Sequence, residues 1–434
     1  MNHKIVIIAT SPYSASSYTR TYDAFFHFWE RDRIVQVFSR NWIPQRGHCS
    51  ELYQITDASM LKKWFFPQKE SGKIYKYEEL EEQNSIKTIN NSWGIKKLYS
   101  YGIAHSSTIE LCRGILWLKR LWCTSQFNKW IDSFKPECVF FEFSNHIFFQ
   151  QVALYIAERF NIPIVVFMGD DFYFNSRFSL SPSYWIYSFF LKRNTRRILL
   201  RNGTHASYST NSLKQKYSDF FHLSGDVVYT NSTVQRRAFK QINTKNPLIV
   251  FLGSIRLGRN NSLLDIADAL GAIDPNYKLE VFSEEKDKSF YRKLQKHPNI
   301  IYGNYIPYSE VQKKISQCDI FVIVEGFRKK DISYTRCSLS TKTADALASG
   351  SSILAYGPQD AGVIDYLIET KSAQVCTDKR KLKDDIMQLL FDKEMQQKLY
   401  DNSMVTYNHH HLVECTTQKF STIVENAVNS WRLA

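Results

Sequence analysis

The chain has 434 residues, and at about 150 residues per domain this length predicts two or three domains with buried cores. Its 44% hydrophobic and 23% charged residues, with only 16 Gly and 11 Pro, exclude disordered, collagen-like and low-complexity chains. The 56 Lys and Arg against 42 Asp and Glu give a net charge of +14. This charge predicts an anionic partner, which leaves nucleic acid, a membrane surface and phosphorylated small molecules open.

The cysteines and the apolar runs limit the cellular setting. No C-x-x-C pair occurs among the eight cysteines, so we predict neither a zinc site nor a disulfide framework, and reduced cysteines favour the cytoplasm. The N-terminal run MNHKIVIIATSPYS is typical of a buried first strand and not of an export signal. No uncharged apolar stretch reaches the roughly 18 to 20 residues of a spanning helix, so we expect any membrane contact to be peripheral.

The predicted elements become regular after residue 136, whereas residues 40–130 give no clear pattern. Residues 137–143 and 162–168 are predicted as strands on either side of a helix at 146–160. After Pro247, further strands are predicted at 248–252, 278–282, 299–302, 319–324, 351–355 and 372–376, with helices at 262–270, 286–296, 309–317, 340–348 and 379–390. Alternating strands and helices predict parallel, doubly wound sheets of the α/β class.

The domain organisation follows from a polar stretch at 231–246. We expect an N-terminal Rossmann-like domain at 1–235 and a C-terminal Rossmann-like domain at 246–410, facing a cleft. A last helix within 411–434 is expected to cross back to the first domain.

A candidate phosphate site follows the strand at 248–252. Gly253, Ser254, Arg256 and Arg259 lie between this strand and the next helix. A glycine turn, arginines and a helix N-terminus together can hold a diphosphate. The alternative is that the arginines are only solvated.

A second constellation occupies residues 340–358. Ser340 or Thr341 can cap a helix, Lys342 lies in its first turn, and Asp345 follows three residues later. A carboxylate there suits two ribose hydroxyls, while Lys342 and the helix start suit a diphosphate. The alternative is an ordinary capped helix.

This stretch resembles the pattern S-K-L-x-E-Y-L-A-x-G-x-P-I-L-A of glycosyltransferases with the two-Rossmann GT-B fold. The most similar are family 4-like bacterial enzymes of surface-polysaccharide assembly, which build capsule, O-antigen and exopolysaccharide. The residues in register are Lys342, Asp345, Leu347, Ala348, Gly350, Ile353, Leu354 and Ala355. The resemblance implies that Asp345 binds the ribose of a nucleotide sugar and that Arg259 contacts the donor diphosphate.

Further matches extend the resemblance over most of 246–376. Tyr302-Gly-Asn-Tyr305-Ile306-Pro resembles the family's G-x-V-P segment, which implies that these side chains line the base pocket. Glu325-Gly-Phe resembles the family's E-x-F-G segment and is expected to bind the donor.

Two departures from the family pattern bear on mechanism. Ser254 stands where the family has a basic residue, so that phosphate contact is expected either to be missing or to be supplied by Arg256. The E-x7-E pair is not intact, because Cys337 stands eight residues before Asp345, and the anomeric outcome stays open although the resemblance implies retention. The basic insert 328–336 is expected to be either a lid over the donor or a solvated loop.

In the first half, Asp170 and Asp171 follow the predicted strand 162–168. Ligands bind at the carboxyl ends of parallel strands, and the resemblance implies that this pair faces the acceptor and orients or deprotonates its hydroxyl. The alternative is that Asp170 caps the next helix. The small polar stretch 11–17 is expected to border the same cleft or to be a simple loop.

Residues 183–201 combine aromatic and basic side chains with no acid. They suit a helix at a membrane interface, although core packing plus a solvated face explains the aromatics equally well. No recognised nucleic-acid motif occurs, so nucleic acid is not an expected partner. The adjacent residues 409–411, all His, are predicted to form a surface turn and not a metal site.

Together these features predict a metal-independent, cofactor-free glycosyltransferase at the cytoplasmic face of the plasma membrane. It would move a sugar from a nucleotide sugar to a saccharide, expected to be lipid-linked, with Arg259 and Lys342 stabilising the leaving diphosphate. Two alternatives remain, a nucleotide-sugar epimerase of the same fold and a non-catalytic basic protein that binds nucleic acid or membrane.

Overall fold

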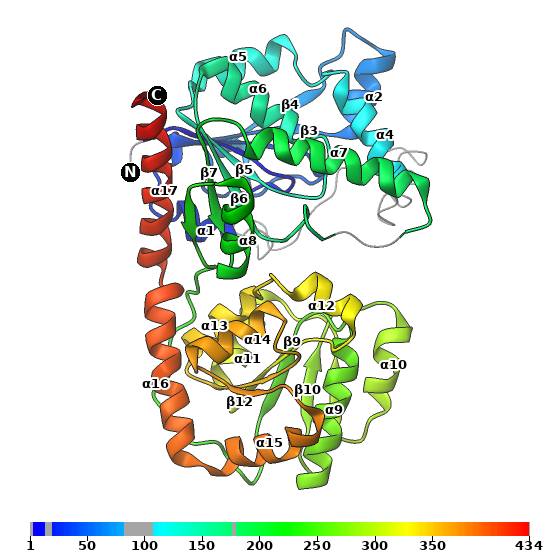
Figure 1. The fold of residues 1–434 in the computed structure, drawn as a ribbon, viewed down its shortest axis with the longest axis vertical. Helices are drawn as coiled ribbons and strands as arrows, with labels where there is room; N and C mark the ends of the chain where they lie inside the picture. Colours follow the sequence, from blue (N-terminus) through cyan, green and yellow to red (C-terminus); the bar gives the residue numbers. More distant parts are fainter. Residues whose placement is uncertain (1–2, 14–19, 82–106, 176–178, 434) are drawn as a thin grey trace. The chain divides into compact units, whose positions relative to one another are not determined.

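The computed structural model describes residues 3–13, 20–81, 107–175 and 179–433. The chain forms two compact units (Figure 1). The N-terminal unit comprises Met1–Val228 and Thr417–Ala434, and the C-terminal unit comprises Tyr229–Thr416. Within the described ranges, no helix is long and apolar enough to cross a bilayer.

The N-terminal unit is an eight-stranded sheet flanked by helices. Its strands are β1 (Ile5–Ile8), β2 (Ile34–Phe38), β3 (Glu51–Ile55), β4 (Gly72–Lys76), β5 (Cys138–Glu142), β6 (Ile164–Met168), β7 (Thr204–Tyr208) and β8 (Gly225–Val227). Its helices are α1 (Arg20–Phe26), α2 (Asp57–Phe65), α4 (Ser107–Leu118), α5 (Ser125–Phe134), α6 (Gln150–Phe160), α7 (Pro182–Leu199) and α8 (Asn211–Phe221), and α17 (Val413–Leu433) joins them from residue 417 onward.

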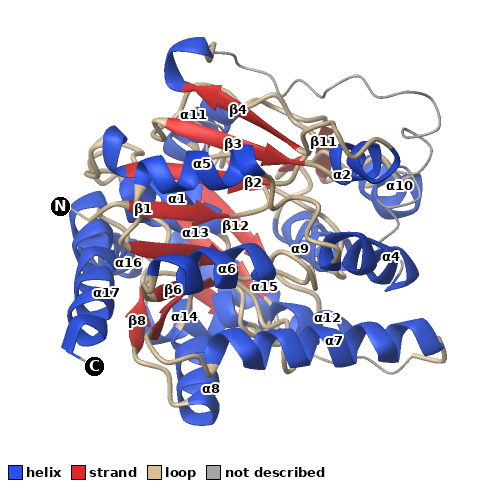
Figure 2. Ribbon diagram, turned by 90° about the horizontal axis from the view of Figure 1, so that it is seen from above, coloured by secondary structure: helices blue, strands red, loops and turns tan. Residues whose placement is uncertain are grey.

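The strand order in this sheet is β4-β3-β2-β1-β5-β6-β7-β8, and part of that succession is visible in Figure 2. Every pair is parallel except β3 with β4, which is antiparallel. β1 lies between β2 and β5, with Ile5 aligned to both Ile34 and Cys138. All four β1 residues are buried, because helices cover both faces of a parallel sheet. The order reverses between β1 and β5, which makes the carboxyl ends of these strands the place where a ligand is expected.

The C-terminal helix packs into the core of the N-terminal unit. Phe420 of α17 lies with its ring centroid 4.8 Å from that of Phe25 and 5.5 Å from that of Phe140. Near the chain end, Trp431 donates a hydrogen bond to the carbonyl of Asn161 at 2.6 Å. Burying such large aromatic side chains stabilises the packing of this last segment on the N-terminal unit.

The C-terminal unit is a six-stranded, all-parallel sheet in the order β11-β10-β9-β12-β13-β14. Its strands are β9 (Ile249–Leu252), β10 (Leu279–Phe282), β11 (Ile300–Gly303), β12 (Ile320–Val324), β13 (Ser352–Tyr356) and β14 (Gln374–Cys376). Its helices are α9 (Arg259–Ile273), α10 (Lys288–Lys296), α11 (Tyr308–Gln317), α12 (Lys329–Thr335), α13 (Thr341–Ser349), α14 (Gly362–Thr370), α15 (Leu382–Phe391) and α16 (Lys393–His410). The order reverses between β9 and β12.

The structure confirms the predicted α/β class and the predicted strands after residue 136, each within about two residues of its expected bounds. The region that gave no pattern contains β3, β4, α2 and α4 among its described residues. The prediction of a surface turn at 409–411 is wrong, because His409 and His410 are the last residues of helix α16 and His411 lies inside the unit. This side chain is fully buried, with Nδ1 2.7 Å from the carbonyl oxygen of Thr230 and Nε2 2.9 Å from the hydroxyl of Tyr366.

Candidate functional site

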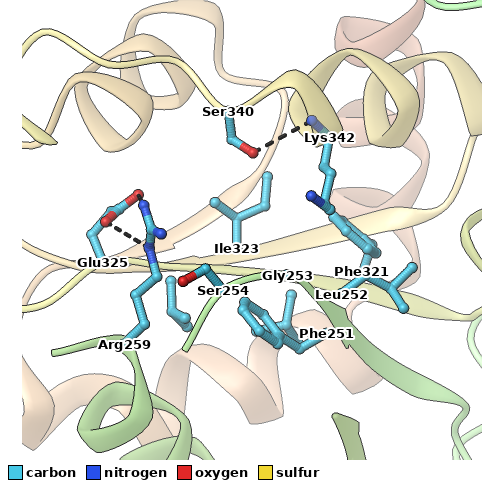
Figure 3. Close-up of a pocket in the computed structure, with 12 residues that line it drawn as sticks. Phe251, Leu252, Gly253, Ser254, Arg259, Phe321, Ile323, Glu325, Ser340 and Lys342 are labelled. Atoms are coloured by element: carbon cyan, nitrogen blue, oxygen red, sulfur yellow. Dashed lines mark hydrogen bonds and ion pairs between the residues drawn. The ribbon is translucent and has the colours of Figure 1, made fainter. Parts of the chain in front are cut away.

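A pocket lies at the carboxyl ends of β9 and β12, where the strand order of the C-terminal unit reverses (Figure 3). It is lined by Phe251, Leu252, Gly253, Ser254, Arg259, Phe321, Val322, Ile323, Val324, Glu325, Ser340 and Lys342. Its volume of about 140 Å³ is smaller than the roughly 300–1,000 Å³ of sites that enclose a whole small molecule, so it suits part of a ligand, such as its phosphate groups. Sheets of this type bind ligands at such a reversal, so the topology and the pocket indicate the same place.

The turn between β9 and α9 shapes one wall of the pocket. Gly258 precedes α9 with φ of +77°, a backbone conformation that favours glycine. A β-carbon at Gly258 would lie 2.5 Å from a carboxylate oxygen of Asp331, so this close approach also requires glycine. The turn therefore holds Arg259, the first residue of α9, against the end of β12.

Arg259 and Glu325 form the central ion pair of the pocket (Figure 3). Arg259 Nε and Nη2 donate to the two carboxylate oxygens of Glu325 at 3.0 and 2.8 Å, and the Glu325 side chain is only 5% exposed. Burial raises the pKa of the Glu325 carboxyl, and the guanidinium of Arg259 opposes that rise. The pair fixes the arginine in place and leaves the two Nη1 hydrogens and one Nη2 hydrogen outside its two hydrogen bonds.

Lys342 and Ser340 bring the N-terminus of α13 to the pocket. The Ser340 hydroxyl caps the helix by accepting a hydrogen bond from the Lys342 amide at 3.4 Å. The Lys342 side chain lies beside Gly253, in the turn after β9, because a β-carbon at Gly253 would be 3.8 Å from Lys342 Cε. Thr341 is exposed and does not line the pocket. An ammonium group beside a helix N-terminus favours an anion there.

Asp345 lies deeper in the same helix and outside the pocket lining. It is fully buried, and its Oδ1 accepts a hydrogen bond from the Ser232 hydroxyl at 2.6 Å. The expectation that this carboxylate is offered to ribose does not fit that geometry, because the helix turns it toward the segment that enters the C-terminal unit. Ser232 was not singled out in the sequence, since nothing local marks a serine that pairs with a residue more than a hundred positions away.

The remaining predicted donor residues lie outside the pocket. Arg256 pairs with Glu285, with Nη2 2.9 Å from Oε1, and does not line the pocket, so its phosphate contact stays a prediction. Tyr302 stacks on Tyr291, with ring centroids 5.5 Å apart. Tyr305 is 60% exposed, and neither Tyr302 nor Tyr305 lines the pocket. Ile306, in the same loop after β11, is half-buried and is also not a lining residue.

The basic insert 328–336 is neither an open loop nor a detached flap. It forms α12, and Asp331 within it is only 3% exposed. Arg328 pairs with both oxygens of Asp331, at 2.6 and 3.1 Å. The buried carboxylate next to Gly258 anchors this segment to the turn before α9.

In the N-terminal unit, the two neighbouring aspartates after β6 differ in their surroundings. Asp171 accepts hydrogen bonds from the Tyr217 hydroxyl and the Phe174 amide, both at 2.9 Å, and its other oxygen pairs with Lys216. Both oxygens are therefore hydrogen-bonded, and Asp171 anchors this loop to α8, while its contact with an acceptor stays a prediction. Asp170 is exposed at the carboxyl end of β6.

Glu142, at the carboxyl end of β5, is a further candidate that was not predicted from the sequence. Thr10, just beyond β1, donates to one Glu142 oxygen from its amide at 3.2 Å and from its hydroxyl at 3.4 Å. Burial raises the pKa of Glu142, and the Thr10 hydrogen bonds oppose the rise. The two residues flank the reversal of strand order in this sheet, and the position of Glu142 at the end of a predicted strand was the signal available. Of the predicted stretch 11–17, residues 14–17 lie outside the described residues.

The pocket of the C-terminal unit has the parts needed to hold a phosphorylated ligand. Two cationic side chains, Lys342 and Arg259, and the amides at the start of α13 can donate hydrogen bonds to an anion. Glu325 can accept a hydrogen bond from a hydroxyl. Among the described residues, no three His, Cys, Asp or Glu side chains converge as a metal site requires.

Comparison with known proteins relates this architecture to solved structures. No protein-family model matches the sequence, and no curated protein matches it. HepE from Anabaena, in complex with UDP, has a TM-score of 0.55 and 11% identity over 98% of this chain and 100% of that chain. Sucrose-phosphate synthase from Thermosynechococcus elongatus has a TM-score of 0.57 and 10% identity over 99% and 100%.

A glycosyltransferase from Rickettsia africae gives a TM-score of 0.50 and 10% identity over 99% of both chains. These similarities extend over nearly the whole of each protein, but identities this low relate folds and not activities. The chain therefore has the GT-B fold, built of two Rossmann-like domains.

Proposed function

We propose that this protein is a glycosyltransferase that moves a sugar from a nucleotide-sugar donor to a saccharide acceptor. The observation that carries the proposal is the pocket at the β9/β12 reversal, where Arg259, Glu325, Lys342 and the start of α13 converge. HepE, which shares the fold, has been crystallised with UDP and with UDP-glucose. A nucleoside diphosphate sugar has the charge and the hydroxyl groups that such a pocket suits.

The reaction requires stabilisation of its leaving group. Breaking the anomeric C–O bond leaves negative charge on the diphosphate, and preorganised donors that face this charge lower the barrier. In our proposal Lys342, Arg259 and the α13 amides provide them, so that no metal and no cofactor is required. Chelation with EDTA is then expected to leave the rate unchanged.

The acceptor is assigned to the N-terminal unit. Asp170 and Glu142 lie at the carboxyl ends of β6 and β5, where a saccharide hydroxyl can be oriented by a carboxylate. We assign the acceptor to a growing, lipid-linked saccharide of bacterial surface polysaccharide, met at the cytoplasmic face of the plasma membrane. The resemblance of residues 340–358 to enzymes of that pathway supports this finer assignment.

The test is a transfer assay on the full chain. UDP-, GDP- and CMP-sugars are incubated with lipid-linked oligosaccharides, and products are detected by mass spectrometry. The proposal predicts a gain of one sugar residue, dependent on one nucleotide class and lost in Lys342→Ala. Conversion or hydrolysis of the nucleotide sugar without acceptor would favour the epimerase alternative, and absence of any turnover would count against both.

A further inference from the structure

The helix α7 places aromatic side chains on its solvent face. Tyr184, Leu191 and Ile198 are buried, whereas Trp185 is 49% and Phe189 61% exposed. Core packing therefore does not account for these two aromatics. Leaving large apolar side chains in water is unfavourable, so a cluster of them indicates a surface that is covered in use.

Neighbouring helices extend this feature. α4 packs against both α7 and α2 within the N-terminal unit, and the three helices can be followed in Figures 1 and 2. We define the apolar surface as the exposed large side chains of these helices and the residue after α2. Its members are Trp64 (41%), Phe65 (73%), Phe66 (50%), Ile115 (58%), Leu118 (62%), Trp185 (49%), Ile186 (51%) and Phe189 (61%).

Basic side chains accompany the apolar ones on the same elements. On α7, three exposed arginines lie 4, 7 and 8 residues after Phe189, which is the spacing of residues on one helical face. They are Arg193, Arg196 and Arg197. At the end of α4, Lys119 lies over the ring of Trp64, with Nζ 3.5 Å from the centroid.

The acidic side chains of these helices form ion pairs within the N-terminal unit, so they do not neutralise the exposed arginines and lysines. Asp57 and Glu110 lie at the starts of α2 and α4, are 16% and 10% exposed, and both pair with Arg113, at 2.9 and 2.6 Å. α7 itself carries no acid, and Glu158 of α6 lies 4.0 Å from Arg197. The three helices therefore present exposed aromatics together with an excess of exposed positive charge.

We propose that the apolar surface docks the protein on an anionic phospholipid bilayer. Tryptophan and phenylalanine settle at the boundary between headgroups and acyl chains, while arginine and lysine contact lipid phosphates. Each basic side chain near an anionic leaflet adds to the attraction, so charge complementarity selects the lipid surface as the occupant. The inference does not depend on the proposed enzymatic activity, because it rests on other residues and is tested by binding alone.

The experiment is flotation of the full chain with vesicles of phosphatidylcholine alone or with 30% phosphatidylglycerol, at roughly 0.1 and 0.5 M salt. The protein is expected to float with the anionic vesicles at low salt and much less with the neutral ones. The double variant Trp185→Ser, Phe189→Ser is expected to weaken the partition about tenfold or more, because two apolar side chains no longer enter the interface. Circular dichroism melting establishes that it folds.

Two further variants sharpen the result. Phe391→Ser is the matched control, because Phe391 is 56% exposed on the C-terminal unit and its loss should leave flotation unchanged. Replacing Arg193, Arg196 and Arg197 by Gln should remove the preference for anionic vesicles. Failure to float with either vesicle, or flotation that the aromatic variant does not weaken, would overturn the proposal. So would self-association that the aromatic variant abolishes, which would assign the surface to a second copy of this chain.

Discussion

The Arg259–Glu325 pair permits a prediction whose sign and size follow from its burial. Replacing Arg259 by Met leaves the Glu325 carboxylate, 5% exposed, without its partner. Removing one member of a buried ion pair lowers the free energy of unfolding by about 3–5 kcal/mol. Because the Arg259 side chain is 21% exposed, we expect a decrease near the lower end of this range. A loss of about 3 kcal/mol in a unit of this size lowers Tm by about 6–12 °C.

The pH dependence of Arg259→Met follows from the same pair. Burial already raises the pKa of Glu325, and loss of the guanidinium raises it further. The folded variant then binds a proton that the unfolded chain releases, so its stability falls as the pH rises between about 4.3 and the raised pKa of Glu325. The slope is at most about 1.4 kcal/mol per pH unit.

The assay is differential scanning calorimetry of the full chain from pH 4 to 8. Glu325→Gln provides the comparison, because it removes the titrating group and leaves an arginine that water can reach. It should be less destabilising than Arg259→Met and should lack the additional slope. The double variant Arg259→Met, Glu325→Gln should lose less stability than the two single variants lose when their losses are added. Equal Tm values for Arg259→Met and the wild type at all pH values would refute the reasoning.

Two further predictions concern Gly326, the residue that follows Glu325, and the two aspartates after β6. Gly326→Ala places a β-carbon 2.2 Å from the carbonyl oxygen of Leu257 and should destabilise by about 1–3 kcal/mol in urea unfolding, whereas Gly169→Ala meets nothing closer than 3.4 Å and should be neutral. Asp171→Asn should lower stability by about 1 kcal/mol while kcat changes little, and Asp170→Asn should lower kcat at least about tenfold. The reverse pattern would return Asp171 to the acceptor site.

The parallel core could be predicted because its strands are continuous apolar runs. β5, β6 and β12 are buried almost throughout, and the segments between them have helical length and periodicity. The region around β3 and β4 could not be predicted, because an antiparallel edge strand such as Gly72–Lys76 mixes lysines with apolar residues. Its place in the sheet is set by pairing with β3 and not by local pattern.

The site was predictable in part for a related reason. A glycine turn and a helix cap are local signals, and they located Gly253, Arg259, Ser340 and Lys342 on one pocket. The orientation of Asp345 depends on tertiary contacts, which local sequence does not encode. The same holds for the outward face of α7, since periodicity alone does not tell which side of a helix meets the sheet.

The central claim is that the C-terminal unit binds a nucleotide sugar through Lys342. Its most direct test is the thermal shift of the full chain with UDP-, GDP- and CMP-sugars, compared among the wild type, Lys342→Ala and Lys293→Ala. Lys293 is an exposed lysine of α10 that does not line the pocket, and it serves as the matched control. We predict that one nucleotide class raises Tm in the wild type and in Lys293→Ala but not in Lys342→Ala, because a ligand of the native state stabilises it. Stabilisation of all three proteins alike, or of none by any nucleotide sugar, would contradict the claim.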